Sequence, residues 1–153
     1  MQRGPEGSSP EDAKGSPNPI PHGYDSAVII GTGVDICEIS RMEALLSRRG
    51  DRAHDRLFTQ EEVRYCSGKA RPAQSFAARF AAKEAVMKLL GTGWSQGIRW
   101  RDIEVKRGKG GPPSIALHGE AAKRAERMGI RRIHLSITHS GDIALVNVIG
   151  ETA

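Results

Sequence analysis

The feature that most constrains the fold is an alanine-rich stretch from Phe76 to Gly91, which reads F-A-A-R-F-A-A-K-E-A-V-M-K-L-L-G. Alanine is the best helix former, and leucine, methionine, lysine, arginine and glutamate follow it closely. Pro72 suits a first helical turn, and Gly91 suits a left-handed cap after the last one. The stretch therefore predicts one long helix that the rest of the chain must accommodate.

Four charged side chains interrupt the apolar sequence of this helix. Arg79 and Lys83 lie four residues apart, as do Glu84 and Lys88, so each pair shares a face. Taken alone, the pattern favours a core helix with an exposed cationic stripe and one ordinary ion pair.

Length and charge narrow the possible functions only broadly. A chain of 153 residues has the length of one domain, and 38% apolar residues can bury a modest core. The net charge of +5 indicates an acidic partner or ligand, which leaves nucleic acid, an anionic membrane, a phosphate-rich small molecule and an acidic protein open. No run of ~18 apolar residues is present, so we expect no membrane span.

The cysteines and the N-terminal sequence indicate in which cellular compartment the protein is expected. Cys37 and Cys66 match no metal-binding or redox spacing, and the N-terminus has no apolar segment of a secretory signal. We therefore expect a reduced, cytoplasmic protein.

The composition divides the chain into two regions. Residues 1–26 are rich in Gly, Pro, Ser and charged residues without apolar periodicity, and we expect a disordered tail there. The folded domain is expected over 27–153. It begins with an apolar, β-branched strand over 27–36, whose Gly31 and Gly33 permit close approach by another element or a ligand.

Periodicity and turn residues predict the remaining elements. A capping box from Thr59 to Glu62 predicts a short helix ending near Cys66. A turn over 139–142 is expected to carry His139 and Ser140. Further strands are predicted over 103–106, 114–117, 133–138 and 143–149, and further helices over 39–50 and 119–128. The sum is an α+β domain, a mainly antiparallel sheet packed with helices.

The helix expected over 39–50 has two contrasting faces. Met42, Leu45 and Leu46 form an apolar stripe at helical spacing. The opposite side is rich in arginine. These arginines are Arg41, Arg48 and Arg49, followed by Arg52 and Arg56. A solvated face is the ordinary explanation, and a docking surface for an acidic protein is the specific one.

Asp35 and Glu84 are acids in mostly apolar settings, far apart in the sequence. Burying a bare carboxylate is costly, so each should be paired or bound to a metal, although Asp35 could also serve the dipole of the helix that follows. If the two converge, they form an oxygen site for Mg²⁺, which takes one or two carboxylates besides water and substrate phosphates. The side chains available to surround a phosphoryl group are Arg71, Arg79, Lys83, Lys88, His139 and Ser140.

Three motifs carry a resemblance to a known family. They read G-T-G-V-D-I-C-E-I-S-R over 31–41, R-F-A-A-K-E-A-V-M-K over 79–88 and L-S-I-T-H-S over 135–140. In order and spacing they resemble the short, single-domain holo-acyl-carrier-protein synthases of the 4′-phosphopantetheinyl transferase superfamily. The match runs from about residue 28 to 150 and implies the fold of that superfamily. The N-terminal tail and the loop over 94–101 depart from the family's usual form.

The resemblance implies a reaction and a set of roles. The family transfers 4′-phosphopantetheine from coenzyme A to a serine of apo acyl carrier protein, and adenosine 3′,5′-bisphosphate leaves. By motif, Asp35 and Glu84 would hold Mg²⁺ against the pyrophosphate, and Lys88 would contact the phosphates and help the leaving group. The residues implied around the 3′-phosphate and the adenosine are Arg71, Arg79, His139 and Ser140, with Lys83 nearby. Arg41, Arg48 and Arg49 would meet the carrier protein, in a homotrimer with active sites between subunits.

Several alternatives stay open at this point. The base that deprotonates the serine could be Glu84, Asp35 or a metal-bound water. A small nucleic-acid-binding protein would explain the net charge, but the chain has no RNP-like aromatic pattern and too few aromatics for base stacking. A non-catalytic carrier-binding module is a third possibility, against which the two acids argue. Carriers of fatty-acid and of polyketide synthesis are equally compatible with the sequence.

Overall fold

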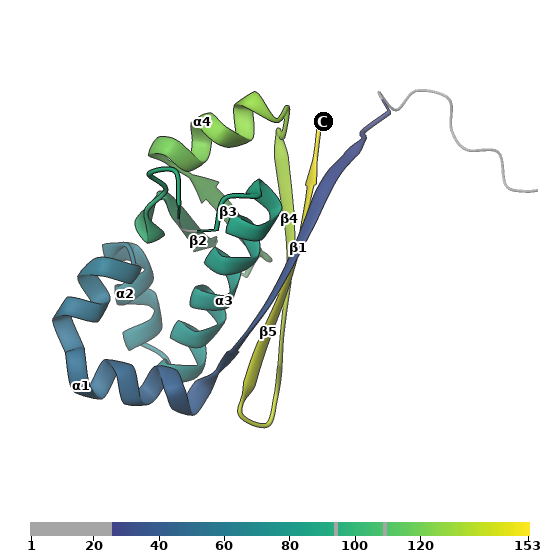
Figure 1. Cartoon of the computed structure of the whole chain (residues 1–153). Coiled ribbons are helices and arrows are strands. Elements are labelled where there is room, and N and C mark those ends of the chain that lie inside the picture. The colour runs from purple at the N-terminus through teal and green to yellow at the C-terminus, as the bar shows by residue number, and fades with distance from the viewer. Residues whose placement is uncertain (1–25, 94, 109) are drawn as a thin grey trace, which may run out of the picture.

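The structure, a computed structural model, describes residues 26–93, 95–108 and 110–153 (Figure 1). The tail expected over 1–26 therefore lies, except for Ser26, outside the described residues. The elements follow in the order β1 (Ile29–Glu38), α1 (Ile39–Leu57), α2 (Gln60–Ser67), α3 (Pro72–Leu90), the 3₁₀ turn η1 (Trp100–Asp102), β2 (Ile103–Arg107), β3 (Pro113–Leu117), α4 (Gly119–Arg127), β4 (Arg132–Ser140) and β5 (Ile143–Glu151). The predicted α+β class is confirmed.

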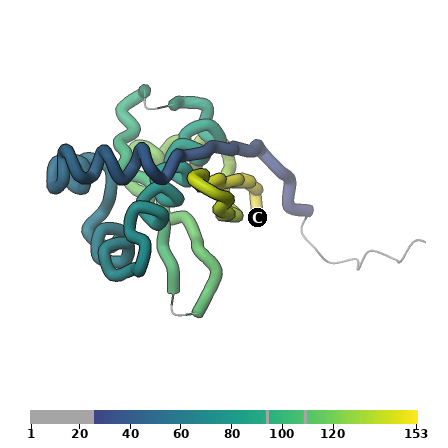
Figure 2. Tube along the Cα trace, turned by 90° about the horizontal axis from the view of Figure 1, so that it is seen from below, coloured from purple at the N-terminus to yellow at the C-terminus, as the bar shows by residue number. Residues whose placement is uncertain are grey.

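Two antiparallel units make up the β structure. The larger is a three-stranded sheet in the order β1-β5-β4, and β2 and β3 form a separate hairpin. Figure 1 shows the helices on one side of the three-stranded sheet. Figure 2 shows α1 leading directly out of β1, while the β2–β3 hairpin projects away from both.

Helix α3 occupies the centre of the molecule, between the sheet and the pair α1 and α2 (Figure 1). Gly91 follows it with φ 69°, so the predicted left-handed cap is confirmed. The exposed cationic stripe predicted for this helix is wrong, because Arg79 and Lys83 are buried and only Lys88 reaches solvent freely. Neighbouring elements cover α3 on nearly every side, which a helix read in isolation does not reveal.

Close packing of β1 on α3 depends on Gly33. A Cβ atom at this position would lie 1.9 Å from the main-chain oxygen of Ala85. No side chain fits there, so the glycine predicted to permit a close approach does so for α3. The two backbones are thereby held at a fixed spacing.

One predicted helix is followed by turns that were not predicted, and one predicted turn is wrong. The helix expected over 39–50 is interrupted at Gly50, where φ is 38° and ψ −117°, and further helical turns follow this kink and continue to Leu57. The resumed turns bury Ala53 and Leu57, and this burial stabilises helix that the glycine alone would end. His139 and Ser140 do not lie in a turn, because β4 continues through both of them in register with β5.

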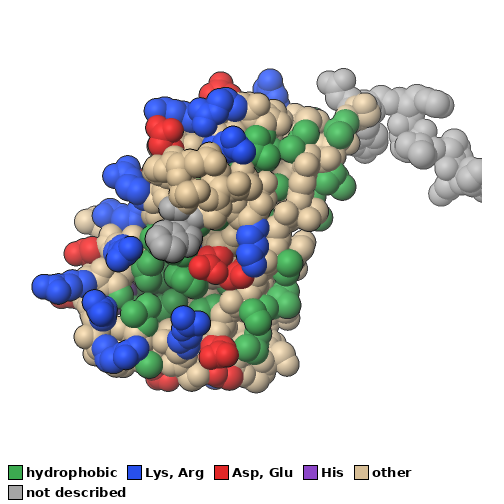
Figure 3. Space-filling view, viewed as in Figure 1, with side chains coloured by type: hydrophobic (Ala, Val, Ile, Leu, Met, Phe, Trp, Pro, Cys, Tyr) green, Lys and Arg blue, Asp and Glu red, His purple; other side chains and the backbone are tan. Residues whose placement is uncertain are grey.

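The sheet face that points away from the helices is uncovered within the described residues. Val34 and Ile36 on β1 are 50% and 56% exposed, whereas Cys37, which points to α3, is buried. In register they lie beside Asn147 and Leu145 of β5. Figure 3 shows apolar side chains exposed along β1.

Candidate active site

The structure brings Asp35 and Glu84 together at the junction of β1 and α3. Asp35 lies two residues after Gly33 on the side of β1 that faces the helices, and Glu84 precedes Ala85 on α3. The contact between Gly33 and Ala85 therefore sets the separation of the two acids. The residues alone left this convergence open, and the family resemblance implied it.

Burial and charge act strongly on Glu84. Burial, and then the carboxyl group of Asp35 beside it, raise the pKa of Glu84 to about 7 from 4.5, although Lys88 and Arg41 oppose this. Because the carboxylate of Asp35 disfavours the ionised form of Glu84, the electrostatic potential at the pair is negative and favours the binding of a cation.

Lys88 pairs with Asp35. Its Nζ lies 2.7 Å from Asp35 Oδ1 and donates to the main-chain oxygen of Val34 at 2.9 Å. The Glu84–Lys88 pair, the ordinary interpretation of the helix pattern, is replaced by this contact across to β1. Lys88 remains half exposed and can still reach a ligand above the acids.

The acid pair fits a hard cation. Asp35 Oδ2 is buried without a hydrogen-bond partner among the described residues, so one carboxylate oxygen is free to bind an ion. The described residues hold no group of three or more His, Cys, Asp or Glu side chains arranged for a metal. Two carboxylates suit Mg²⁺, which completes its coordination with water and substrate phosphates.

Arg79 and His139 line one surface hollow of about 430 Å³ between α2, α3, β2 and β4. Arg79 is 5% exposed, and its Nε is buried without a hydrogen-bond partner in the described part of the chain. Its Nη1 donates a long hydrogen bond of 3.5 Å to the main-chain oxygen of Ser75. A nearly buried guanidinium so poorly satisfied is suited to an anionic ligand.

Arg71 and Ser140 lie at the surface. Arg71 is exposed at the residue that precedes α3, and Ser140 is exposed at the end of β4, next to His139. Neither side chain lines the hollow that Arg79 and His139 share. Both remain available to a ligand that extends beyond it.

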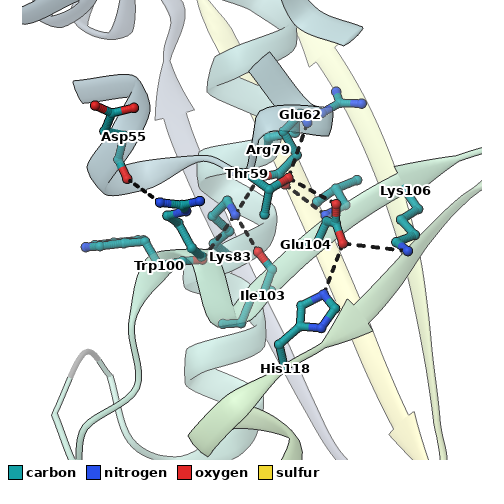
Figure 4. A network of polar contacts seen from close by, with 12 residues as sticks. Asp55, Thr59, Glu62, Arg79, Lys83, Trp100, Ile103, Glu104, Lys106 and His118 are labelled. Carbon is teal, nitrogen blue, oxygen red and sulfur yellow. Dashed lines mark hydrogen bonds and ion pairs between the residues drawn. The ribbon is translucent and has the colours of Figure 1, made fainter. Parts of the chain in front are cut away.

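Lys83 corrects the sequence interpretation. Its side chain is completely buried, with Nζ 2.8 Å from Glu62 Oε2 and 3.1 Å from the oxygen of Trp100, and it also donates to the oxygen of Ile103 (Figure 4). Burial lowers the pKa of Lys83, against the opposing effect of Glu62. The three protons of the ammonium thus meet three acceptors, and none is left for a phosphate.

The buried contact of Lys83 belongs to a wider network that holds α2, α3 and β2 together (Figure 4). Glu62 also accepts from the main-chain nitrogens of Thr59 and Val105, at 2.9 and 2.8 Å. The capping box predicted at Thr59 is confirmed, and Glu62 extends it into the core. The lysine next to Glu84 therefore fixes the rotation of α3 rather than contacting a ligand.

The arginines of α1 are exposed, as predicted. The three proposed for docking are Arg41, Arg48 and Arg49, and Arg52 and Arg56 follow them. Figure 3 shows blue side chains gathered over this part of the molecule. The turn between β4 and β5 caps the start of this helix, because the main-chain nitrogen of Ser40 donates to Asp142 Oδ1 at 2.9 Å.

Sequence reasoning missed Tyr65 and Arg107, which line the same hollow as Arg79. Neither belongs to a motif, and α2 and β2 bring them to α3 only through the fold. The one available signal was composition, because Tyr65 is one of two tyrosines in a chain with 5% aromatic residues.

Comparison with known proteins decides the family. A model of the 4′-phosphopantetheinyl transferase superfamily matches residues 31–144. The chain is 48% identical over 124 residues to the holo-[acyl-carrier-protein] synthase of Koribacter versatilis, covering 81% of this chain and 99% of that protein. The chain belongs to the holo-acyl-carrier-protein synthase family. The synthase of Geobacter sulfurreducens is 43% identical, with 81% of this chain and 98% of that protein covered.

Solved structures of the synthase family share the fold. The synthase of Neisseria meningitidis superposes with a TM-score of 0.73 at 32% identity, over 80% of this chain and 98% of that one. The Helicobacter pylori synthase in complex with coenzyme A gives 0.68 at 28% identity, over 78% and 98%. Among the residues described, no helix is long and apolar enough to cross a membrane.

Proposed function

We propose that this member of the synthase family transfers 4′-phosphopantetheine from coenzyme A to a serine of apo acyl carrier protein with the help of Mg²⁺. The observation that carries the proposal is the Asp35–Glu84 pair with its unpartnered buried oxygen. The names of the relatives supply the substrates, and a relative from Helicobacter pylori has been solved with coenzyme A.

In the proposed reaction, the serine oxygen forms a bond to the β-phosphorus of the pyrophosphate. The bond from this phosphorus to the bridging oxygen breaks, and adenosine 3′,5′-bisphosphate leaves with the electron pair. Asp35 and Glu84 would hold the ion, which would neutralise charge on the pyrophosphate. Lys88, half exposed beside Asp35, stabilises charge on the leaving phosphate.

The serine proton needs an acceptor. The pKa of Glu84 is raised to about 7 in the metal-free protein, and a bound cation would lower this pKa and so favour the carboxylate form that can accept a proton. Asp35 already accepts from Lys88, so its oxygen on that side is less available. We propose Glu84 as the stronger candidate of the two for this role.

We place the 3′-phosphate and the adenosine at the hollow that Arg79 and His139 line. The described part of the hollow contains no carboxylate, and its apolar wall includes Leu135 and Ile137. Arg71 and Ser140, exposed nearby, complete the set of residues proposed to contact this end of coenzyme A.

Cys37 and Cys66 are free and buried, which fits a reducing cytoplasm.

We further propose that the active site lies between copies of the chain in a homotrimer. Arg79 and Glu84 are five residues apart on α3, so they point in directions about 140° apart around the helix axis. A single coenzyme molecule can contact an arginine and an acid of this kind more readily when one copy of the chain supplies Arg79 and a second copy supplies Glu84. The exposed apolar side chains Val34 and Ile36 provide a surface for association.

A carrier-mass assay tests the proposed function. Purified protein, coenzyme A and Mg²⁺ are incubated with apo acyl carrier protein, and mass spectrometry reads the addition to the carrier. We expect holo carrier and free adenosine 3′,5′-bisphosphate with the wild type. Chelation of the metal should stop the reaction, and Asp35→Asn or Glu84→Gln should lower kcat at least 100-fold. Glu126→Gln, an exposed change on α4, is the matched control.

The contrary results are distinct. A wild type that leaves the carrier mass unchanged with Mg²⁺ refutes the transfer. Full activity of either acid variant across a Mg²⁺ titration shows that the residue does not hold the ion. Fatty-acid and polyketide carriers are compared in the same assay by their kcat/KM values.

A further inference from the structure

Tyr65 of α2 lies at the centre of a group of three cations. The Arg79 guanidinium carbon is 4.1 Å from the centroid of the Tyr65 ring, and Lys69 Nζ is 4.2 Å from it. Arg107 Nη1 lies 3.4 Å from the Tyr65 hydroxyl oxygen. A ring of this kind holds a guanidinium through its negative face.

Lys69, Arg79 and Arg107 form no ion pair with an acid of the described residues. Tyr65, Arg79 and Arg107 line two hollows: the one of about 430 Å³ that reaches His139 has no carboxylate among its described lining residues, whereas a second of about 350 Å³ includes Glu61 and Glu104. The acids on the adjoining surface are engaged elsewhere, because Glu61 pairs with Arg64 at 2.6 Å and Glu104 accepts from His118 at 3.0 Å. Like charges held together in this way are stabilised by an external anion.

The environment of the Tyr65 hydroxyl is consistent with an electropositive site. Burial opposes its ionisation, but hydrogen bonding and charge from Arg107 and Lys69 outweigh burial and lower the pKa of Tyr65 below its ordinary value. The same field would act on a phosphate in the hollow. Arg79 Nε, buried and unpartnered, supplies a donor there.

We propose that Tyr65 is a positioning residue that holds the Arg79 guanidinium for the 3′-phosphate of coenzyme A, and that Arg107 is a further cation of this subsite. This inference rests on the proposed function. It predicts that both residues govern discrimination between coenzyme A and 3′-dephospho-coenzyme A, which lacks that phosphate. A purely structural role would affect both donors alike.

The test compares KM and kcat for the two donors at saturating carrier protein. Tyr65→Leu and Tyr65→Gln both remove the ring, and agreement between them excludes a fold defect particular to one. We expect each to raise KM for coenzyme A by about 3- to 30-fold, the range of one cation–π contact, with KM for the dephospho donor nearly unchanged. Tyr65→Phe keeps the ring and should stay within about threefold of wild type.

Arg107 is tested in the same way. Arg107→Gln changes an exposed side chain and should reduce the preference for coenzyme A without altering the melting temperature. Arg64→Gln is the matched control, because Arg64 is the exposed neighbour of Tyr65 and already pairs with Glu61. Its donor preference should equal that of the wild type.

Direct binding separates this inference from the proposed function. Calorimetry measures the affinity of each protein for adenosine 3′,5′-bisphosphate and for adenosine 5′-monophosphate, without any transfer. Ring-removing variants that weaken both nucleotides, or both donors, equally overturn the positioning role. A wild type that prefers the bisphosphate yet transfers nothing refutes the proposed function and leaves the subsite standing.

Discussion

Glu84 gives the metal-free protein a distinct dependence on pH. Its folded pKa of about 7 lies above the ordinary 4.5, first through burial and then through Asp35. A raised acid pKa favours folding fully below pH 4.5, and that contribution is lost as the pH rises through 7. Glu84→Gln removes this loss, so the variant should gain stability relative to wild type between these values.

The measurement is the melting temperature from pH 5 to 8 in the presence of a chelator. We expect the variant's advantage to grow with pH to about 1 kcal/mol, a figure reduced for solvent screening because the side chain is partly exposed. Added Mg²⁺ should shrink the difference, since the ion offsets the charge that the wild type carries. Parallel curves for wild type and variant would contradict the raised pKa.

Arg48 belongs to the docking surface proposed on α1. Charge reversal at Arg41 and Arg48 should raise KM for the carrier protein about tenfold, while KM for coenzyme A changes much less. Because the charge of Arg41 also acts on Glu84, Arg48→Glu alone is the cleaner variant. Salt should reduce the effect, since exposed charges are screened over a Debye length of ~8 Å at physiological ionic strength.

Arg127→Glu provides the control for the docking test, because it reverses an exposed charge on α4. Unchanged carrier kinetics in the double variant at low salt would show that α1 is not the docking surface. Weakened binding to DNA or RNA, without any transfer by the wild type, would favour the nucleic-acid interpretation instead.

Some elements were predictable because their signals are local. Thr59 and Glu62 form their capping box within one helical turn, and Gly91 ends α3 by its own backbone conformation. The continuation of α1 past Gly50 was not predictable, since it depends on burial of later turns against other elements. Lys83 was misplaced for the same reason: its partner Glu62 comes from another helix.

The site was predictable to a similar extent. The resemblance gave the acids and the arginines, and the structure shows Asp35 beside Glu84 and Arg79 in the same hollow as His139. Tyr65 could not be predicted, because its contact with Arg79 exists only after α2 has packed on α3. Contacts between elements carry information that a motif does not contain.

The assembly of the whole molecule can be tested by complementation. If each active site combines the acids of one copy with the hollow of another, Glu84→Gln and His139→Ala subunits should restore activity when mixed and reassembled. About a quarter of the interfaces of an equal, random mixture would hold both intact halves. Light scattering should report a trimer, and Val34→Lys on the exposed sheet face should dissociate it.

Two results would contradict this assembly. A mixture whose activity equals the sum of its separate components would place each site within one copy. A wild type that scatters light as a monomer would refute the trimer outright. Glu126→Gln mixed with wild type controls for effects of reassembly itself.

The spacing at Gly33 has a consequence for inherited variation. A methyl group there would meet the oxygen of Ala85 at 1.9 Å, and β1 and α3 would have to separate. This separation would move Asp35 of β1 away from Glu84 of α3, because both acids lie close to the Gly33–Ala85 contact in the sequence. In a genetic screen, an allele encoding Gly33→Ala would consequently show the same phenotype as substitutions of Asp35 or Glu84, although Gly33 has no side-chain functional group to lose.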